Sequence, residues 1–260
     1  MSRDYRKPFA KKSLGQNFLV DHNYIRKIVA AIDPQPTDTI IEIGPGRGAI
    51  TEGLVESGAK IVAIELDRDF APQLAETFKD KPNFRVIEAD ATQIDFSGLL
   101  EGTRVKVVAN LPYYISTAIL QHLAAQRDHF KSLVLMFQKE VVDRISALPG
   151  DSERGFLTAI TELAFTVERL FDVPPSAFRP VPKVTSTVAR LTPKAKSGVN
   201  EELFRDLVST AFSQKRKTIL NNLKSRYPDA REKLERSGID ASRRAESLLL
   251  EEWISLFHSL

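Results

Sequence analysis

Four residues at the end of an apolar run carry the most specific chemistry in this sequence. Asn110, Leu111, Pro112 and Tyr113 follow residues 105–109, a run typical of a buried strand. Proline disfavours helical backbone at the preceding residue, which fixes the direction of the Leu111 carbonyl. The Asn110 side-chain oxygen and this carbonyl can accept both hydrogens of one planar NH2 group, while Tyr113 offers a ring for stacking. This set suits the exocyclic amine of a nucleobase; a strand that ends in a turn with aromatic packing is the alternative.

Three earlier apolar runs end in residues that suit an adenosine-containing ligand. Gly44, Gly46 and Gly48 in "EIGPGRGAIT" permit a tight turn and a close approach of backbone to ligand. Glu65 follows about 20 residues later, where an acid accepts hydrogen bonds from both ribose hydroxyls. Asp90 can accept a hydrogen bond from the amino group of an adenine. Taken singly, the glycines could form a turn without a ligand and the Asp could cap a helix. Together, on successive strands, they predict a cofactor pocket.

The residues near these strand ends favour one cofactor over another. A nicotinamide dehydrogenase needs a proton-transfer partner, and the four histidines, at 22, 122, 129 and 258, all lie away from the strand ends. An exocyclic amine is a poor nucleophile, but two acceptors in a site closed to water favour a pyramidal nitrogen that can attack a methyl group. The absence of cysteine agrees, because methylation at a pyrimidine ring carbon normally uses a Cys adduct. We therefore expect S-adenosylmethionine as cofactor and no metal.

The elements that must position these residues follow from the hydrophobic pattern. Short β-branched runs alternate with helical patterns between residues 39 and 148, and the near-continuous apolar character of the runs is typical of a parallel sheet covered on both faces. Asp21 is a predicted N-cap of a preceding helix that ends before Pro34. The predicted fold class is α/β, a Rossmann-like doubly wound domain.

The pattern changes after residue 171. Four prolines, at 174, 175, 180 and 182, exclude a helix, and "TSTVARL" at 185–191 predicts a late strand. The stretch 193–200 has the composition of a linker, and only helical patterns follow it. We expect a methyltransferase domain at 1–195, with a basic leader, and a small helical domain at 196–260.

Charge and composition limit the partners. The 260-residue chain has a formal net charge of only +3, yet basic residues cluster near both ends. Such clusters suit contact with a polyanion, although solvated charge is an equally good interpretation of each cluster alone. No apolar stretch approaches the roughly 20 residues that span a bilayer, and no secretory signal is evident, so a cytoplasmic location is expected.

Several blocks together resemble the ribosomal RNA adenine dimethyltransferases, most closely their bacterial small-subunit branch. The blocks are "KKSLGQNFLVD", "EIGPGRGAIT", "IELDRD", "NLPYYIST", "QKEVVDR", "VPPSAFRPVPKV" and "AFSQKRKTILNNL". They occur in the family's order and cover nearly the whole chain. The resemblance implies dimethylation of two adjacent adenosines in a hairpin loop near the 3′ end of 16S RNA, with a partly assembled small subunit as substrate and partner.

The resemblance also assigns roles to residues. Cofactor contacts are implied for Asn17, Leu19, Gly44, Gly46, Glu65, Leu66, Asp90, Ala91 and Asn110. The target base, removed from its stack, would be held by Asn110, Leu111, Pro112 and Tyr113, with Phe178 as a second stacking face or a core residue. RNA phosphates would be contacted by Lys11, Lys12, Lys215, Arg216 and Lys217, the last three in a helical pattern.

Some alternatives stay open. Many family members have Tyr-Gly and Leu-Ser in the region of "RGFLT" at 154–158, so the role of this segment is undetermined, whereas Tyr114 in place of the common Asn changes little. The sister group that methylates 23S RNA usually has Ile at the position of Leu111. A non-catalytic RNA-binding or assembly factor on the same fold is a further alternative. Nothing in the sequence requires more than a monomer.

Overall fold

The computed structural model describes residues 16–99 and 102–260, which cluster into two compact units. The first contains the described residues up to Val142 together with Glu168–Pro193, and the second contains Asp143–Val167 and Lys194–Leu260. The sequence predicts a single boundary after residue 195. The structure instead places residues 143–167 in the second unit.

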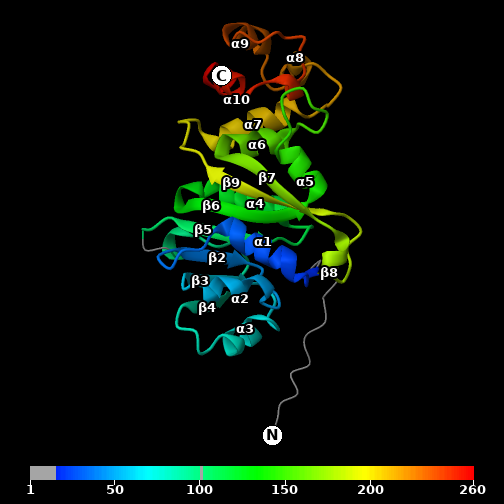
Figure 1. Ribbon diagram of the computed structural model, residues 1–260. Coiled ribbons are helices and arrows are strands. Elements are labelled where there is room, and N and C mark those ends of the chain that lie inside the picture. Colours follow the sequence, from blue (N-terminus) through cyan, green and yellow to red (C-terminus); the bar gives the residue numbers. More distant parts are fainter. Residues whose placement is uncertain (1–15, 100–101) are drawn as a thin grey trace. The chain divides into compact units, whose positions relative to one another are not determined.

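The first unit is a Rossmann-like doubly wound domain built on a seven-stranded sheet in the order β4-β3-β2-β5-β6-β9-β7 (Figure 1). Neighbouring strands from β4 to β6 are parallel, and β9 is antiparallel to β6. The strand bounds are β2 Thr39–Ile43, β3 Lys60–Glu65, β4 Phe84–Glu88, β5 Val105–Asn110, β6 Phe130–Gln138, β7 Phe165–Val173 and β9 Ser186–Pro193. The predicted parallel strands and the late strand are confirmed, whereas the sequence reading did not identify β7.

Helices cover both faces of this sheet. Their bounds are α1 His22–Ile32, α2 Ala49–Glu56, α3 Ala71–Thr77, α4 Ser116–Ala125 and α5 Lys139–Ile145, with single 3-10 turns at η2 Ser97–Leu99, η3 Arg127–His129 and η4 Pro175–Ala177. Figure 1 shows α1 and α2 side by side, and both pack on alternate strand residues such as Ile40 and Val108. The intervening residues, for example Ile41 and Val107, point to the other face and are also buried.

The first helix starts and stops as its sequence predicts. The Asp21 side chain accepts a hydrogen bond from the Asn23 backbone N–H and caps the N-terminus of α1. Asp33, just before Pro34, takes a left-handed conformation with φ of 48° and ends the helix. The helix buries Ile25, Ile28 and Ile32 against the sheet.

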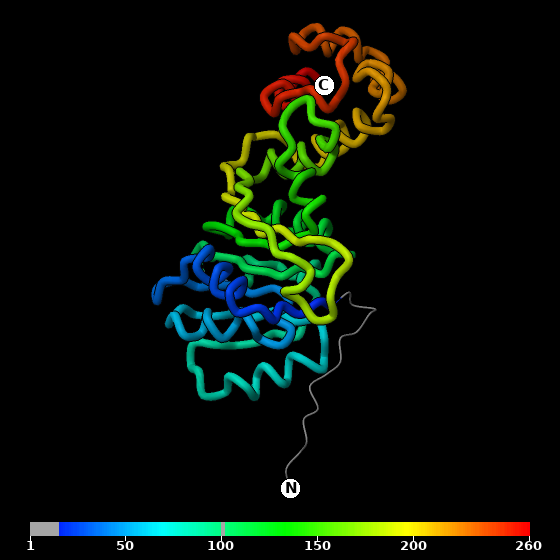
Figure 2. Tube along the Cα trace, turned by 45° about the vertical axis from the view of Figure 1, so that its right-hand side comes forward, coloured from blue at the N-terminus to red at the C-terminus, as the bar shows by residue number. Residues whose placement is uncertain are grey.

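A second, two-stranded sheet joins distant parts of the first unit. Strand β1 (Phe18–Leu19) pairs antiparallel with β8 (Phe178–Arg179), with Phe18 opposite Arg179. The Val20 N–H extends the contact by donating to the Ala177 carbonyl over 2.9 Å. Figures 1 and 2 both show the yellow-green segment around β8 beside the start of the described chain.

The second unit is mainly helical and has a core of its own. It contains α6 Phe156–Ala164, α7 Glu201–Ala211, α8 Ile219–Leu223, α9 Ala230–Arg236 and α10 Leu250–His258, with the turn η5 Ala245–Ser247. Trp253 is fully buried among apolar residues of these helices, including Phe204 and Leu207. The helical character predicted for the C-terminal segment is therefore confirmed.

Candidate functional site

A cavity of about 600 Å³ lies in the first unit, at the carboxyl ends of the parallel strands. The strand order reverses between β2 and β5, and the crevice at such a switch point is where doubly wound sheets bind ligands. All nine predicted cofactor positions line the cavity: Asn17, Leu19, Gly44, Gly46, Glu65, Leu66, Asp90, Ala91 and Asn110. Leu111, Pro112 and Tyr113 line it as well. The structure thus brings together residues from four strand ends and from the segment before α1.

The turn between β2 and α2 can be built only with glycine at key positions. Gly44, Gly46 and Gly48 have φ values of 67°, 55° and 79°, a region that side chains rarely tolerate. A Cβ added at Gly46 would lie 3.0 Å from the Phe18 ring. The glycines therefore allow the turn to pass close to β1 and keep its backbone at the cavity wall.

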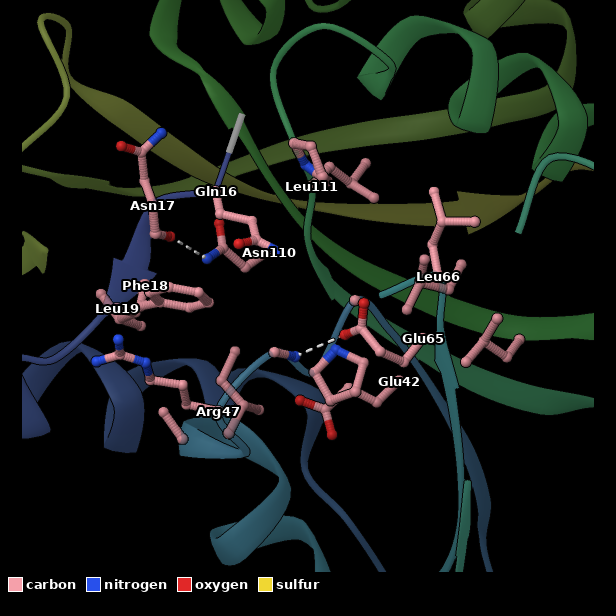
Figure 3. A pocket seen from close by; sticks show the side chains of 18 of the residues that line it. Gln16, Asn17, Phe18, Leu19, Glu42, Arg47, Glu65, Leu66, Asn110 and Leu111 are labelled. Atoms are coloured by element: carbon pink, nitrogen blue, oxygen red, sulfur yellow. Dashed lines mark hydrogen bonds between the residues drawn. The ribbon is translucent and has the colours of Figure 1, made fainter. Parts of the chain in front are cut away.

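Glu65 ends β3 with its carboxylate held in one orientation. Its Oε2 accepts a hydrogen bond from the Gly46 N–H (Figure 3), and its Oε1 accepts one from the Asp67 N–H, each over 2.9 Å. The side chain is only 6% exposed, and this burial raises its pKa although the backbone hydrogen bonds lower it. Each carboxylate oxygen retains capacity for a further hydrogen bond. The group is therefore positioned to accept two ligand hydroxyls.

A second buried acid in the cavity wall, Glu42, was missed by sequence reading. It lies in β2, and its Oε2 accepts a hydrogen bond of 2.7 Å from the Thr51 hydroxyl in α2. Burial, with a smaller contribution from the charge of Glu65, raises its pKa to about 7, while the Thr51 hydrogen bond lowers it. The signal available in the sequence was an acid in the otherwise apolar run "TIIEI", two residues before the glycine turn.

Asp90, beyond the end of β4, lies at the start of a turn and caps no helix. Its Oδ1 accepts hydrogen bonds from the Thr92 N–H and hydroxyl, at 2.9 and 2.7 Å, as in a local turn. This leaves Oδ2 as an acceptor in a residue that lines the cavity. A local structural role and a ligand contact are therefore compatible.

A hydrogen bond to the segment before β1 fixes the orientation of the Asn110 amide. Its Nδ2 donates a hydrogen bond of 3.1 Å to the backbone carbonyl of Asn17, which lines the same cavity directly before β1 (Figure 3). Within the described ranges, neither Asn110 Oδ1 nor the Leu111 carbonyl accepts a hydrogen bond. The structure therefore leaves two acceptors, on successive residues, unused.

Tyr113 is fixed beside these acceptors. Its hydroxyl shares a hydrogen bond of 2.7 Å with the Ser186 hydroxyl at the start of β9. Burial of the phenol raises its pKa, so the group is neutral at physiological pH. The half-buried ring is thereby held as an uncharged aromatic surface in the cavity wall.

Phe178 does not lie where a stacking residue would. Its ring is fully buried in the apolar cluster that includes Leu19 and Val173, and it does not line the cavity. The reason is the pairing of β8 with β1, which places Phe178 opposite Leu19 and behind the cavity wall. In this structure Phe178 is a core residue, the alternative that the sequence left open.

The predicted RNA-binding residues divide into two groups. Lys11 and Lys12 lie outside the described residues. Lys215, Arg216 and Lys217 are exposed, but in a turn between α7 and α8 instead of the expected helix. The buried Asn222 amide donates to the Ala211 and Gln214 carbonyls, which satisfies the end of α7 and stabilises the turn.

Residues 154–158 have a structural role within the second unit. The Arg154 guanidinium is buried and donates to the carbonyls of Ala147 and Leu248 and, over 2.7 Å, to the Glu162 carboxylate. Thr158 donates to the Arg144 carbonyl. These bonds connect the loop before α6 to α5 and to the segment before α10.

No group of three or more His, Asp or Glu side chains in the described ranges is arranged to bind a metal ion. No helix in that part of the chain is long and apolar enough to cross a membrane.

Known proteins resemble this chain over nearly its whole length. Residues 9–260 match the family described as ribosomal RNA adenine dimethylase. The chain is 44% identical to the ribosomal RNA small subunit methyltransferase A of Saccharophagus degradans, covering 96% of this chain and 94% of that protein. It is 43% identical to the protein of the same name from Geobacter metallireducens, covering 96% and 95%.

Solved structures show the same fold. A dimethyladenosine transferase from Plasmodium falciparum matches with a TM-score of 0.80 at 28% identity, covering 92% of this chain and 95% of that one. The 23S rRNA methyltransferase ErmE matches with a TM-score of 0.72 at 26% identity, covering 94% and 99%.

Proposed function

Because this chain belongs to the ribosomal RNA adenine dimethylase family, we propose that it dimethylates the exocyclic amines of two adjacent adenosines in the 3′-terminal hairpin loop of 16S ribosomal RNA. The methyl donor is S-adenosylmethionine. The substrate is the small ribosomal subunit or its late precursor, in the cytoplasm. The observation that carries this proposal is the Asn110 amide, whose nitrogen is bonded to Asn17 and whose oxygen is left as an acceptor.

The cavity residues fit the cofactor. Glu65, held by two backbone N–H groups, would accept the ribose hydroxyls, and the free oxygen of Asp90 would accept from the adenine amino group. The glycine turn and the segment Asn17–Leu19 would hold the remaining, methionine part. The cavity volume lies within the range usual for ligands of this size.

The residues at the end of β5 would activate the target base. Bound S-adenosylmethionine supplies an electrophilic methyl group on a sulfonium. Asn110 Oδ1 and the Leu111 carbonyl accept the two N–H bonds of the adenine amine, which favours a pyramidal nitrogen with its lone pair directed away from the acceptors. The Tyr113 ring stacks on the extruded base. The nitrogen is positively charged after the transfer and loses its proton to water, while the two acceptors only orient its N–H bonds.

The same arrangement accounts for a second transfer to one nitrogen. A monomethylated amine retains one N–H, so only one of the two acceptors is then used. Stacking on Tyr113 must hold the base more strongly at this stage. Loss of the ring should therefore reduce the second transfer more than the first.

The similarity to named proteins supports the small subunit as target. The relatives named for the small subunit are 43–44% identical, compared with 26% for ErmE. Leu111 in the strand-end motif agrees with this choice. An assembly factor without catalysis is a weaker candidate, because a cavity with oriented acceptors would then have no use.

RNA phosphates would be contacted by basic residues away from the cavity. We assign this role to Lys11 and Lys12 and to the exposed turn Lys215–Lys217, with the helical segment 196–260 as an RNA-binding domain of a monomeric enzyme. The logarithm of RNA affinity falls as the logarithm of the salt concentration rises. Replacing all three residues of the turn by alanine should make this negative slope shallower by about 2, measured by titration of a single-stranded RNA.

Mass spectrometry of digested RNA tests the proposal. The protein and S-adenosylmethionine are incubated with small subunits that lack dimethyladenosine, and with unmodified large-subunit RNA. Two dimethyladenosines in the small-subunit hairpin are expected. Modification of the large-subunit RNA alone would replace the target with 23S RNA. Modification of neither RNA, despite cofactor binding by calorimetry, would contradict the proposal and favour an assembly factor.

A further inference from the structure

The segment between β8 and β9 borders the cavity at both of its ends. At its start, Arg179 pairs with Phe18, which lines the cavity. At its end, Ser186 shares a hydrogen bond with the cavity residue Tyr113. The Thr185 carbonyl accepts a hydrogen bond from the Lys139 N–H, which holds the segment to the end of β6. In Figure 2 it is the yellow-green loop beside the blue start of the described chain.

Exposed apolar side chains occur both in this segment and among the residues that line the cavity, where Val20 and Tyr114 are found. Val181, Val184 and Tyr114 are 58%, 40% and 59% exposed. Val20, beside β1, is 40% exposed. These four are a large part of the exposed large apolar residues that the first unit presents within the described ranges. We call Tyr114 and residues 179–185 the rim.

Cations accompany the apolar side chains. Lys183 lies between Val181 and Val184, is exposed, and forms no ion pair within the described part of the chain. The Arg179 guanidinium donates to the Ser176 and Phe178 carbonyls, which keeps the positive charge at the start of the rim. An aromatic ring and aliphatic side chains interleaved with cations suit bases and phosphates of an unpaired strand.

We propose that the rim is the docking surface for the single-stranded nucleotides that flank the target adenosine. This inference rests on the proposed function, because the nucleotides bound at the rim are those next to the adenosine that Asn110 would hold. Tyr114 and the valines contact the faces of neighbouring bases, and Lys183 contacts a phosphate. A second protein or another copy of this chain would also cover apolar residues, but neither would require a cation such as Lys183, which has no ion pair within the described ranges, between the two valines.

Binding measurements that do not depend on catalysis test the rim. The probes are an RNA hairpin with adjacent adenosines in its loop and a fully paired RNA of equal length, titrated by fluorescence anisotropy at fixed salt. Tyr114→Ala and the double variant Val181→Ser/Val184→Ser should each weaken hairpin binding about tenfold. Tyr114→Phe should restore it, because the ring is retained. The affinity of the valine variant for S-adenosylmethionine, by calorimetry, and that of both variants for the paired RNA should be unchanged.

Two matched controls separate the rim from general surface effects. Leu148→Ser removes an apolar residue that is 69% exposed in the second unit. Lys60 starts β3, at the end of the sheet opposite the cavity, and is exposed like Lys183. Lys183→Glu should weaken hairpin binding several-fold and reduce its salt dependence, whereas Lys60→Glu should have little effect.

The outcomes distinguish the rim from the proposed function. If the rim variants bind the hairpin as tightly as the parent protein does, the rim proposal is wrong, whatever the methylation assay shows. It is also wrong if they change the sedimentation coefficient of the protein and not its RNA affinity, because the rim is then a protein interface. If the rim variants lose hairpin binding while the parent protein methylates no adenosine, the rim stands and the proposed reaction fails.

Discussion

Glu65 in the first unit and Arg154 in the second are both buried charged side chains, but their partners are of different kinds. Arg154 is bonded to the Glu162 carboxylate and two carbonyls. Glu65 has two backbone N–H donors, and no basic side chain in the described ranges pairs with it. Glu42 resembles Glu65 in this respect, with Thr51 as its partner.

The difference separates structural from ligand-binding groups. A buried charge that is paired with an opposite charge leaves an uncompensated partner when it is removed, and this loss destabilises the fold. A buried polar group with unused acceptor capacity is costly unless a ligand completes its bonds. Glu65 and Asn110 in the cavity have unused acceptors, whereas Arg154 in the second unit has a carboxylate and two carbonyls as partners.

The largest expected effect is at Asn110. Asn110→Ala removes one of two acceptors and should reduce the rate of methyl transfer by about 100- to 1,000-fold, measured in single-turnover assays. The melting temperature should change little, since the side chain makes one hydrogen bond within the described chain. Parental turnover by this variant would contradict the base-activating role.

Arg154→Ala should instead lower the stability of the protein and leave its ligand binding intact. It leaves the Glu162 carboxylate and two carbonyls without their donor, and the free energy of unfolding should fall by about 3 kcal/mol in denaturant titrations. The affinity for S-adenosylmethionine should be unchanged in molecules that remain folded. If Arg154→Ala lost cofactor binding without losing stability, Arg154 would not be a structural residue and the contrast with Glu65 would be wrong.

Glu65→Ala tests whether a buried acid of the cavity binds a ligand. It should weaken S-adenosylmethionine binding by about 10- to 100-fold in calorimetry, because two charge-assisted hydrogen bonds to the ribose are lost. RNA affinity should not change. An unchanged cofactor affinity would show that the ribose is held elsewhere.

The smallest effect concerns pH. Because the pKa of Glu42 is raised to about 7 in the fold, the native state binds its proton more tightly than the unfolded chain does. Its contribution to stability is therefore present at low pH and is lost as the pH rises through about 7. Glu42→Gln should raise the free energy of unfolding of the ligand-free protein by about 1–2 kcal/mol at pH 8 and by much less at pH 5. An equal change at both pH values would mean that Glu42 does not titrate in this range.

Local sequence pattern predicted the first unit well because its elements follow local rules. The parallel strands are apolar runs, Asp21 is a side-chain cap, and the glycine turn requires positive φ. Residues at strand ends could be predicted to meet, since parallel strands present their carboxyl ends at one edge. Glu65, Asp90 and Asn110 lie in one cavity for this reason.

The errors and omissions depend on contacts that local pattern does not contain. Phe178 is buried because β8 pairs with β1, and the turn Lys215–Lys217 is stabilised by Asn222, which bonds to the end of α7 from the next helix. The bond between the Asn110 amide and the Asn17 carbonyl also connects residues far apart in sequence. Each case requires knowledge of tertiary pairing.

The pairing of β1 with β8 has a consequence for biosynthesis. Phe18 and Arg179 are neighbours in space, but most of the first unit is translated between them. The β2–β5 pair is likewise non-local. Contacts of such long sequence separation form slowly and only after both partners have left the ribosome. A nascent chain arrested before residue 179 should therefore contain much of the sheet and yet lack the β1–β8 pair beside the cavity.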